Sequence, residues 1–214
     1  MKSQKVGWYF LRDDVEDIRK KIVKRFDFID SARERAKTLS NTVLRLSFHS
    51  VSSIHRRDLK SAESYLSECS EYIKRLLEIY KIAPSVMGIA KDAFKEYSEA
   101  MCLFYIVKKN SFPDPEKLGV PYSSFIGGLA ECVGELRRQF LEELKDGTLE
   151  RAEDYFGIME EIYELLLSIN YCSTITDNIR VKRDYVRRLL ERSHAELTRA
   201  TLEDKVIQNL KRGG

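Results

Sequence analysis

The chain has 214 residues and a net charge of only +3, with 43% hydrophobic and 33% charged residues. So many charged residues exclude an integral membrane protein, and so many apolar ones exclude an intrinsically disordered chain. The longest uncharged stretch, residues 118–130, contains Pro121 and two glycines, so it cannot cross a bilayer as a helix. No apolar run at the start is long enough for a signal peptide, and we therefore expect a cytoplasmic protein without membrane contact.

The first third of the chain is predicted to form long helices. Neither proline nor glycine, the strongest helix breakers, occurs between Trp8 and Ala83. Apolar residues recur at steps of three and four over residues 13–57, which is the helical period. This pattern is compatible with one long helix or with two. Asp58 can cap the next helix, which we expect to reach about residue 82.

The middle of the chain is divided by a loop at residues 110–120, which contains two prolines and a glycine. We expect one helix before it, over residues 85–109, and another after it, from Pro121 to about residue 145. Gly147 follows directly and is a typical helix terminator. The two helices on either side of this loop carry the acidic residues discussed below.

The C-terminal part is predicted to contain two more helices. Thr148 can cap the first, to about residue 167, and Asp177 the second, to about residue 200. The segment between them is short and polar and is expected to be a connector. Together these elements predict an all-α protein, a single-domain bundle of about six to seven long antiparallel helices over residues 1–214. Its ends, residues 1–10 and 201–214, are expected to be frayed.

Four glutamates lie at helical spacing on the two middle helices. Glu96 and Glu99 share one face of the first, and Glu131 and Glu135 share one face of the second. If the two faces meet, the carboxylates form a site for a hard cation such as Mg2+ or Mn2+, which prefers oxygen ligands. The alternative is a solvated helix face, since 34 acids make such pairs common by chance. The Gly127-Gly128 pair, which permits close helix approach, favours a site.

Three segments resemble those of a known family in order and spacing. They are a basic, serine-containing helix at 33–40 that leads to a His-Arg pair within 54–57, the motif E-Y-S-E-A at 96–100, and G-L-A-E-C-V-G-E-L at 128–136. In these segments, which lie within about residues 32–144, the chain is similar to the translin/TRAX family. It looks like the TRAX type in a compact, prokaryotic form.

The resemblance implies a translin-like fold of about seven helices that assembles into a closed, hollow octamer. TRAX-type subunits are Mg2+-dependent endoribonucleases, and translin-type subunits mainly bind RNA and DNA. The metal-binding and catalytic acids of the TRAX type carry over to Glu96, Glu99, Glu131 and Glu135. The position of Glu131 is commonly aspartate in the family, and the extra methylene moves the carboxylate by about 1.5 Å. This difference bears on the geometry of the metal site.

Two groups of basic residues are candidates for nucleic-acid binding, because arginine and lysine pair with phosphate. One group lies near a helix end, where its match to the family motif supports it, and the other lies on the last helix. A solvated or intersubunit face is the alternative for the last helix. The candidates are His55, Arg56, Arg57 and Lys60 in the first group, and Arg183 and Arg187 in the second.

We therefore expect a homo-oligomer, an octamer by the resemblance, that binds RNA and cleaves it with Mg2+ or Mn2+ as a hydrolase. Single-stranded DNA is a further ligand that the resemblance suggests, and a second, translin-type subunit is left open as a partner. One alternative is a non-catalytic oligomer that binds RNA or single-stranded DNA. The other is a structural helical adaptor whose acids are solvated.

Overall fold

The computed structural model describes residues 8–212, and these form helices and connections without any strand. Six helices have 20 residues or more, so the predicted all-α bundle of long helices is confirmed. Within the described range no helix is long and apolar enough to cross a membrane. The elements are α1 (Trp8–His55), α2 (Leu59–Ile82), the 3-10 helix η1 (Pro84–Val86), α3 (Met87–Lys109), α4 (Pro115–Leu118), α5 (Tyr122–Lys145), α6 (Leu149–Ser168), α7 (Ser173–Thr176) and α8 (Ile179–Arg212).

The N-terminal segment is one continuous helix, which decides the question that the sequence left open. α1 has 48 residues and ends at His55, where Arg57 adopts a left-handed conformation with φ of 62°. Asp58 then caps α2 as predicted, because its carboxylate accepts a hydrogen bond from the Ser61 amide at 3.1 Å. The end of α1 lies beside α5, where His55 is hydrogen-bonded to Glu135.

Some predicted helix ends, connectors and caps differ from the structure. The 3-10 turn that begins at Pro84 delays the start of α3, and the two predicted connectors each contain a four-residue helix. Thr148 precedes α6 but makes no side-chain capping bond, and Asp177 pairs with Lys91 two residues before α8 begins. α8 continues to Arg212 instead of ending near residue 200. Of the termini expected to fray, residues 8–10 and 201–212 are helical, and residues 1–7 and 213–214 lie outside the described range.

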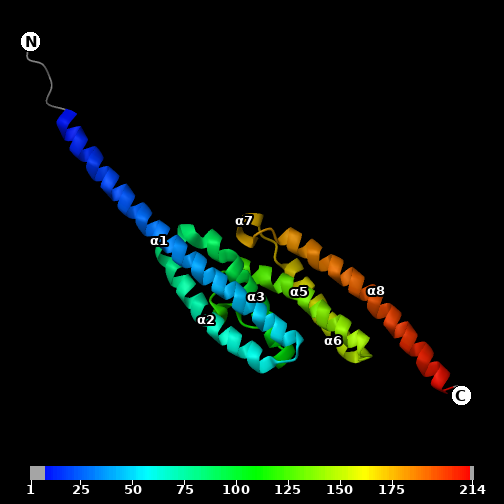
Figure 1. Ribbon diagram of the computed structural model, residues 1–214. Coiled ribbons are helices and arrows are strands. Elements are labelled where there is room, and N and C mark those ends of the chain that lie inside the picture. The colour runs from blue at the N-terminus through cyan, green and yellow to red at the C-terminus, as the bar shows by residue number, and fades with distance from the viewer. Residues whose placement is uncertain (1–7, 213–214) are drawn as a thin grey trace, which may run out of the picture.

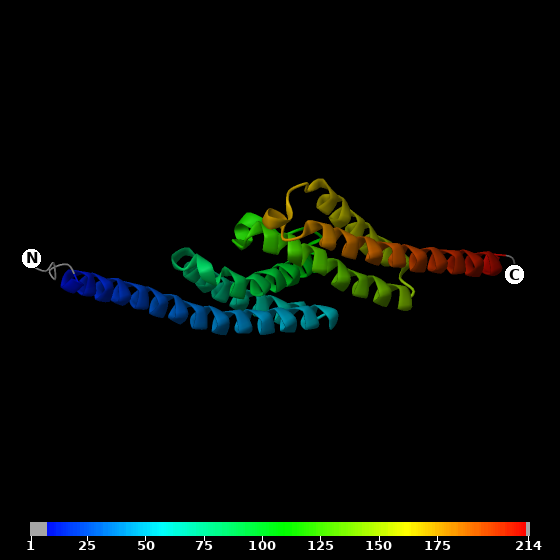
Figure 2. The same cartoon turned by 90° about the horizontal axis from the view of Figure 1, so that it is seen from above.

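The helices pack in a sequence of neighbours with α3 and α5 at the centre. α1 packs against α2 and α3, α3 against α5, and α5 against both α6 and α8. Figures 1 and 2 show that the first part of α1 and the last part of α8 project beyond the bundle at opposite ends. α3 is buried on most of its circumference, which agrees with its nearly uniform apolar sequence. The centre of the bundle therefore contains the two helices that carry the glutamates.

Candidate carboxylate and metal site

Three of the four predicted glutamates meet between α3 and α5. Glu96, Glu99 and Glu131 each offer a carboxylate oxygen, and these oxygens lie within 4.8 Å of one another. Gly128 makes this possible, because a Cβ at its position would lie 2.4 Å from the Lys95 carbonyl oxygen and 2.6 Å from the Glu99 amide nitrogen. Any side chain there would push the two backbones apart. The sequence prediction that small residues bring the acidic faces together is therefore consistent with this packing.

The fourth glutamate, Glu135, is hydrogen-bonded to a histidine. His55, at the end of α1, forms a hydrogen bond between its Nε2 and a Glu135 carboxylate oxygen. The other ring nitrogen, Nδ1, lies 2.7 Å from the Gln139 amide nitrogen, which is the donor in this pair. In the tautomer that fits both contacts, Nδ1 accepts and Nε2 donates to Glu135. The His55 side chain is only 7% exposed, so it differs from the surface phosphate ligand that the sequence predicted.

A lysine lies against the three clustered carboxylates. Lys95 Nζ donates a hydrogen bond to Glu131 Oε1 at 2.9 Å and lies 3.7 Å from Glu96 Oε1. Burial alone would lower the pKa of Lys95, but the hydrogen bond and the charges of Glu131 and Glu96 raise it. The ammonium group is therefore charged at neutral pH and neutralises part of the cluster.

The protonation of the acids depends on these partners. Burial raises the pKa of the Glu99 carboxyl to about 8, and the charges of Glu96, Glu131 and Glu135 add to the effect. Burial also raises the pKa of Glu96, against the opposing charge of Lys95. For Glu135 the hydrogen bond from His55 lowers the pKa. Near neutral pH the site thus contains both protonated and ionised carboxyl groups.

The three clustered acids fit one hard divalent cation. Magnesium binds oxygen ligands at about 2.1 Å, so two oxygens on one ion lie at most about 4.2 Å apart. The oxygens of Glu96, Glu99 and Glu131 lie within 4.8 Å, so a small change of side-chain torsions would close the site. Burial and neighbouring acids raise the pKa of Glu96 and of Glu99, and a bound cation would favour the ionised form of both groups. Glu135 is not part of this group of three, and its Oε2 is hydrogen-bonded to His55.

The acids line a pocket of ≈ 460 Å³ whose opposite wall is formed by α8. Lys182, Tyr185 and Arg188 line it from that helix, across from Glu99, Glu131 and Glu135. Lys182 is held by the carbonyl oxygen and the carboxylate of Asp177. Sequence reasoning missed Tyr185 and Gln139. Gln139 could have been found, because it lies four residues after Glu135 on the same helix face.

The predicted basic residues lie outside this pocket. Arg57 is within 3.6 Å of the buried Glu143 and within 3.5 Å of Asp146, and Arg56 donates to the Ser53 hydroxyl at 3.1 Å. Lys60 is exposed on α2. Arg56 and Lys60 therefore lie on the surface, as a phosphate ligand must, whereas Arg57 also holds the end of α5.

The two arginines of α8 that were predicted to bind nucleic acid differ in their contacts. Arg183 donates to the carbonyl oxygens of Leu166, Leu167 and Ile169, which lack helical partners at the end of α6. Its guanidinium thus caps a helix, and the structure differs here from the predicted phosphate ligand. Arg187 is exposed and lies 3.5 Å from both Asp184 and Glu191. Of the two, only Arg187 stays available to a nucleic acid.

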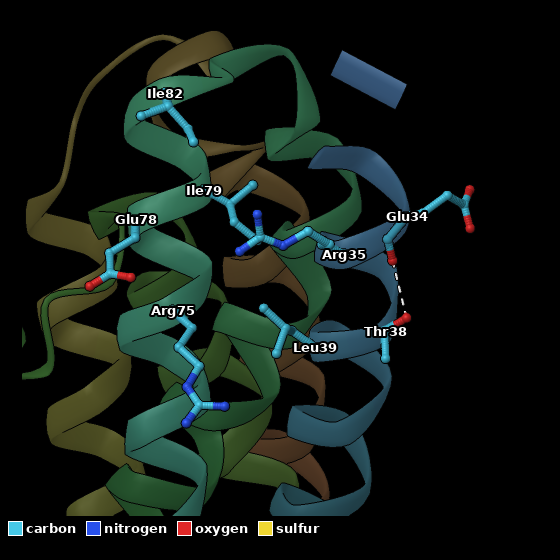
Figure 3. A pocket seen from close by; sticks show the side chains of 8 residues that line it. All are labelled: Glu34, Arg35, Thr38, Leu39, Arg75, Glu78, Ile79 and Ile82. Atoms are coloured by element: carbon cyan, nitrogen blue, oxygen red, sulfur yellow. Dashed lines mark hydrogen bonds between the residues drawn. The ribbon is translucent and has the colours of Figure 1, made fainter. Parts of the chain in front are cut away.

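A second pocket, of ≈ 580 Å³, lies between α1 and α2 and has mixed character. Figure 3 shows that Arg35 reaches towards Ile79, while Glu34 and Glu78 point to opposite sides of the groove. Its acids are therefore separated, unlike those between α3 and α5. Among the described residues, Glu96, Glu99 and Glu131 form the group of acids whose oxygens are close enough to hold one metal ion.

Known proteins support the same view of the fold. No family model matches the chain. The uncharacterized protein MJ0175 of Methanocaldococcus jannaschii is 34% identical over 185 residues, which cover 86% of this chain and 82% of that protein. The crystal structure of AfC3PO and that of its complex with duplex RNA each have a TM-score of 0.80 and 27% identity. They cover 86% of this chain and 97% and 96% of theirs. The fold of apo-NeC3PO is also similar, with a TM-score of 0.74 and 24% identity over 93% of this chain and 100% of that chain.

Proposed function

We propose that the chain is a member of the translin family and a Mg2+-dependent endoribonuclease whose catalytic pocket lies between α3, α5 and α8; its likeness to the AfC3PO structures supports this. One observation carries this proposal. Three carboxylates from two helices, Glu96, Glu99 and Glu131, offer oxygens within 4.8 Å of one another, and two of them, Glu99 and Glu131, line a pocket. Lys95 offsets only part of the charge of these acids, and carboxylate oxygens gathered from two helices are the ligands that a hard divalent cation prefers, so the arrangement favours a metal site over a solvated face. The complex of AfC3PO with duplex RNA supports RNA as the ligand.

The residues have separate roles in this proposal. Glu96, Glu99 and Glu131 would hold Mg2+, or Mn2+ in its place. When bound, the ion supplies positive charge to a phosphate and lowers the pKa of a water. Glu135, which His55 keeps ionised, is the candidate general base that accepts the proton of the attacking water. The water oxygen forms a bond to phosphorus, the chain P–O bond breaks, and the leaving oxygen takes a proton from solvent.

The test is cleavage of a labelled RNA by the purified protein. Single-stranded and duplex RNA are incubated with Mg2+, with Mn2+ and with EDTA, and the products are separated by length. We expect internal cleavage with either metal and none with EDTA. Binding of the same RNAs and of single-stranded DNA is measured in parallel, with EDTA present. Metal-independent cleavage, or no cleavage of any RNA under these conditions, would contradict the proposal.

We also propose that the active form is a homo-oligomer larger than a dimer, an octamer if it follows the family. The projecting part of α1 exposes apolar side chains at helical spacing, among them Val15, Ile18, Ile22 and Phe26, each between 48% and 65% exposed. Isolated apolar stripes of this kind are typical of helix–helix interfaces. Light scattering at micromolar concentration should give a mass several times 25.0 kDa. A mass of one chain would contradict this part of the proposal.

A second candidate function, RNA binding without cleavage, is favoured by Lys95. Its ammonium group already lies within 3.7 Å of Glu96 and within 2.9 Å of Glu131, where a cation would bind. If the Lys95 ammonium group occupies the place of the metal ion in the folded protein, it neutralises the acids, and no metal ion is present to lower the pKa of a water. Titration with Mn2+, followed by electron paramagnetic resonance, separates the two functions. Absence of bound Mn2+ together with salt-dependent RNA binding would establish the non-catalytic one.

A further inference from the structure

Tyr185 of α8 faces the acidic pocket from the side opposite the metal site. Its side chain lines the pocket together with Glu99, Glu131 and Glu135. The hydroxyl group lies against Gly134 of α5, so closely that a Cβ at that glycine would be 2.7 Å from the hydroxyl oxygen. The same Cβ would lie 4.0 Å from Cζ of the ring, which is an ordinary contact. Gly134 therefore leaves room for the hydroxyl group specifically and not for the ring.

The hydroxyl group has its proton available for a ligand. A tyrosine hydroxyl has an ordinary pKa of about 10, so the group is protonated at neutral pH. No hydrogen bond of this hydroxyl to another group is found among residues 12–211. The side chain is 37% exposed, so it can be reached from solvent. A tyrosine placed only for packing would not need a glycine opposite its hydroxyl.

An RNA phosphate in this pocket needs donors on the α8 side. The α3 and α5 side carries carboxylates, which repel a phosphate wherever a cation does not lie between them. Arg188 lines the pocket one turn beyond Tyr185, and both side chains are donors at neutral pH. Because Asp177 already binds Lys182, Tyr185 and Arg188 are the donors on α8 that stay free for a phosphate.

We propose that Tyr185 is a catalytic residue that donates a hydrogen bond from its hydroxyl to a non-bridging oxygen of the scissile phosphodiester, and that Gly134 is required to admit that hydroxyl. The inference rests on the proposed endoribonuclease function and names a group of that same pocket. No bond forms or breaks at the tyrosine, which stabilises the charge that grows on the phosphate oxygens as water attacks. A donor of this kind, held in place before the reaction, typically contributes about 100-fold to 1000-fold to kcat.

The first test is Tyr185→Phe, which removes one oxygen atom from the pocket. We expect kcat for RNA cleavage to fall by about 100-fold, with KM, Mn2+ affinity and the oligomer mass unchanged. Tyr72→Phe on α2, also half-buried but away from the pocket, is the matched control and should cleave like the wild type. A Tyr185→Phe protein with wild-type kcat would overturn the inference. So would a parallel loss of Mn2+ binding, because the tyrosine would then act through the metal site.

The second test is Gly134→Ala in two backgrounds, with thermal stability as a readout that needs no activity. In the wild-type background, the new methyl group meets the Tyr185 hydroxyl, so kcat should fall to about the level of Tyr185→Phe. In the Tyr185→Phe background it meets only the ring at ordinary distance, so kcat should not fall further. There, alanine should raise the melting temperature, because it has a higher helix propensity than glycine. Equal effects of Gly134→Ala in both backgrounds would overturn the assigned contact.

The two proposals fail in different ways. If the wild-type protein and all variants leave RNA uncut and bind no Mn2+, the endoribonuclease function is wrong, and the role of Tyr185 falls with it. If the wild type cleaves RNA, Glu99→Gln does not, and Tyr185→Phe cleaves at the wild-type rate, only the role of Tyr185 is wrong.

Discussion

The acidic pairs of α3 and α5 have the same residue type at nearly the same helical spacing, yet their environments differ. On α5, Glu131 is hydrogen-bonded to Lys95 and Glu135 to His55. On α3, Glu99 has no such partner within residues 12–211, and its pKa is raised to about 8 mainly by burial. The difference teaches that helical spacing gathers carboxylates, whereas their partners decide which of them are ionised. In the proposed reaction the acids of α3 are metal ligands, and Glu135 of α5 is the carboxylate that is already ionised.

The largest effect is expected from Glu99→Gln, which removes the most strongly perturbed acid. RNA cleavage should be abolished, because the cluster loses one of its three closely placed carboxylates. RNA binding should be largely retained, since no phosphate contact is removed. Product analysis by gel and a binding titration with EDTA check the two outcomes. Full cleavage activity would show that α3 and α5 do not form one site.

The same variant should alter the pH dependence of stability. The folded pKa of Glu99, about 8, lies above the ordinary value of 4.5, so the folded protein binds more protons than the unfolded chain between these values. The stability that this group contributes is thus complete below about pH 4.5 and is lost as pH rises through 8. Without metal, the Glu99→Gln protein should therefore melt higher than the wild type at pH 8, and the two should converge towards pH 5. Added Mg2+ should stabilise the wild type alone.

The next largest effect is expected on the free energy of unfolding, where Glu135→Gln on α5 is compared with Glu96→Gln on α3. Glu135→Gln replaces a charge-assisted hydrogen bond of the buried His55 by a neutral one, which should cost about 1 kcal/mol. Glu96→Gln removes a carboxyl whose pKa burial has raised, so without metal it should be neutral or stabilising. Urea unfolding at pH 7 with EDTA gives both free energies. Changes of the same sign would mean that the environments of α3 and α5 are alike.

The convergence of three acids was predictable, because it depends on local features. Helical spacing places Glu96 and Glu99 on one face, and the Gly-Gly pair on α5 permits the close approach that brings in Glu131. The all-α fold was predictable for the same reason, since the apolar period and the positions of proline and glycine are properties of short segments. Helix ends were less predictable. For α8, nothing after residue 200 breaks the helix before the glycines at 213–214.

The partners of the acids could not be predicted from spacing. His55 and Glu135 are separated by 80 positions, and they meet where α1 ends beside α5. The contact of Tyr185 with Gly134 depends on how α8 packs against α5, and no local sequence pattern predicts that packing. Arg183 was predicted to bind phosphate together with Arg187, but the carbonyl groups at the end of α6 occupy its guanidinium. Tertiary contacts thus determine the partners of these side chains, and the spacing of residues within one helix does not.

A smaller effect is expected from Lys95→Met, which removes the ammonium group that lies between Glu96 of α3 and Glu131 of α5. Loss of the ammonium group should leave Glu131 and Glu96 without their counter-charge, so the metal-free protein should be less stable. Mn2+ should bind more tightly, by about tenfold if about 1.4 kcal/mol of repulsion is relieved. Lys91→Met is the matched control on the same helix, because Lys91 pairs with Asp177 instead, at 2.6 Å. Unchanged Mn2+ affinity in Lys95→Met would show that the lysine and the metal do not compete.

The smallest effect is expected outside the pocket, where basic residues should contribute to binding and not to cleavage. Arg56 is exposed and makes one hydrogen bond, to Ser53, so charge reversal there should leave the fold intact. Arg57 is a poorer choice, because it also holds Glu143 and Asp146. Arg56→Glu should weaken the binding of every RNA sequence alike, because phosphates carry no sequence information.

The salt dependence of binding distinguishes a phosphate contact from an indirect effect. The slope of log affinity against log salt should become shallower by about 1 for Arg56→Glu. Lys74→Glu, an equal charge change on the exposed face of α2, is the control and should leave the slope unchanged. The value of kcat with saturating RNA should stay at the wild-type level, because the carboxylate pocket is untouched. An unchanged slope for Arg56→Glu would show that Arg56 does not contact RNA. The binding surface would then be expected on α8, and Arg187→Glu should make the slope shallower.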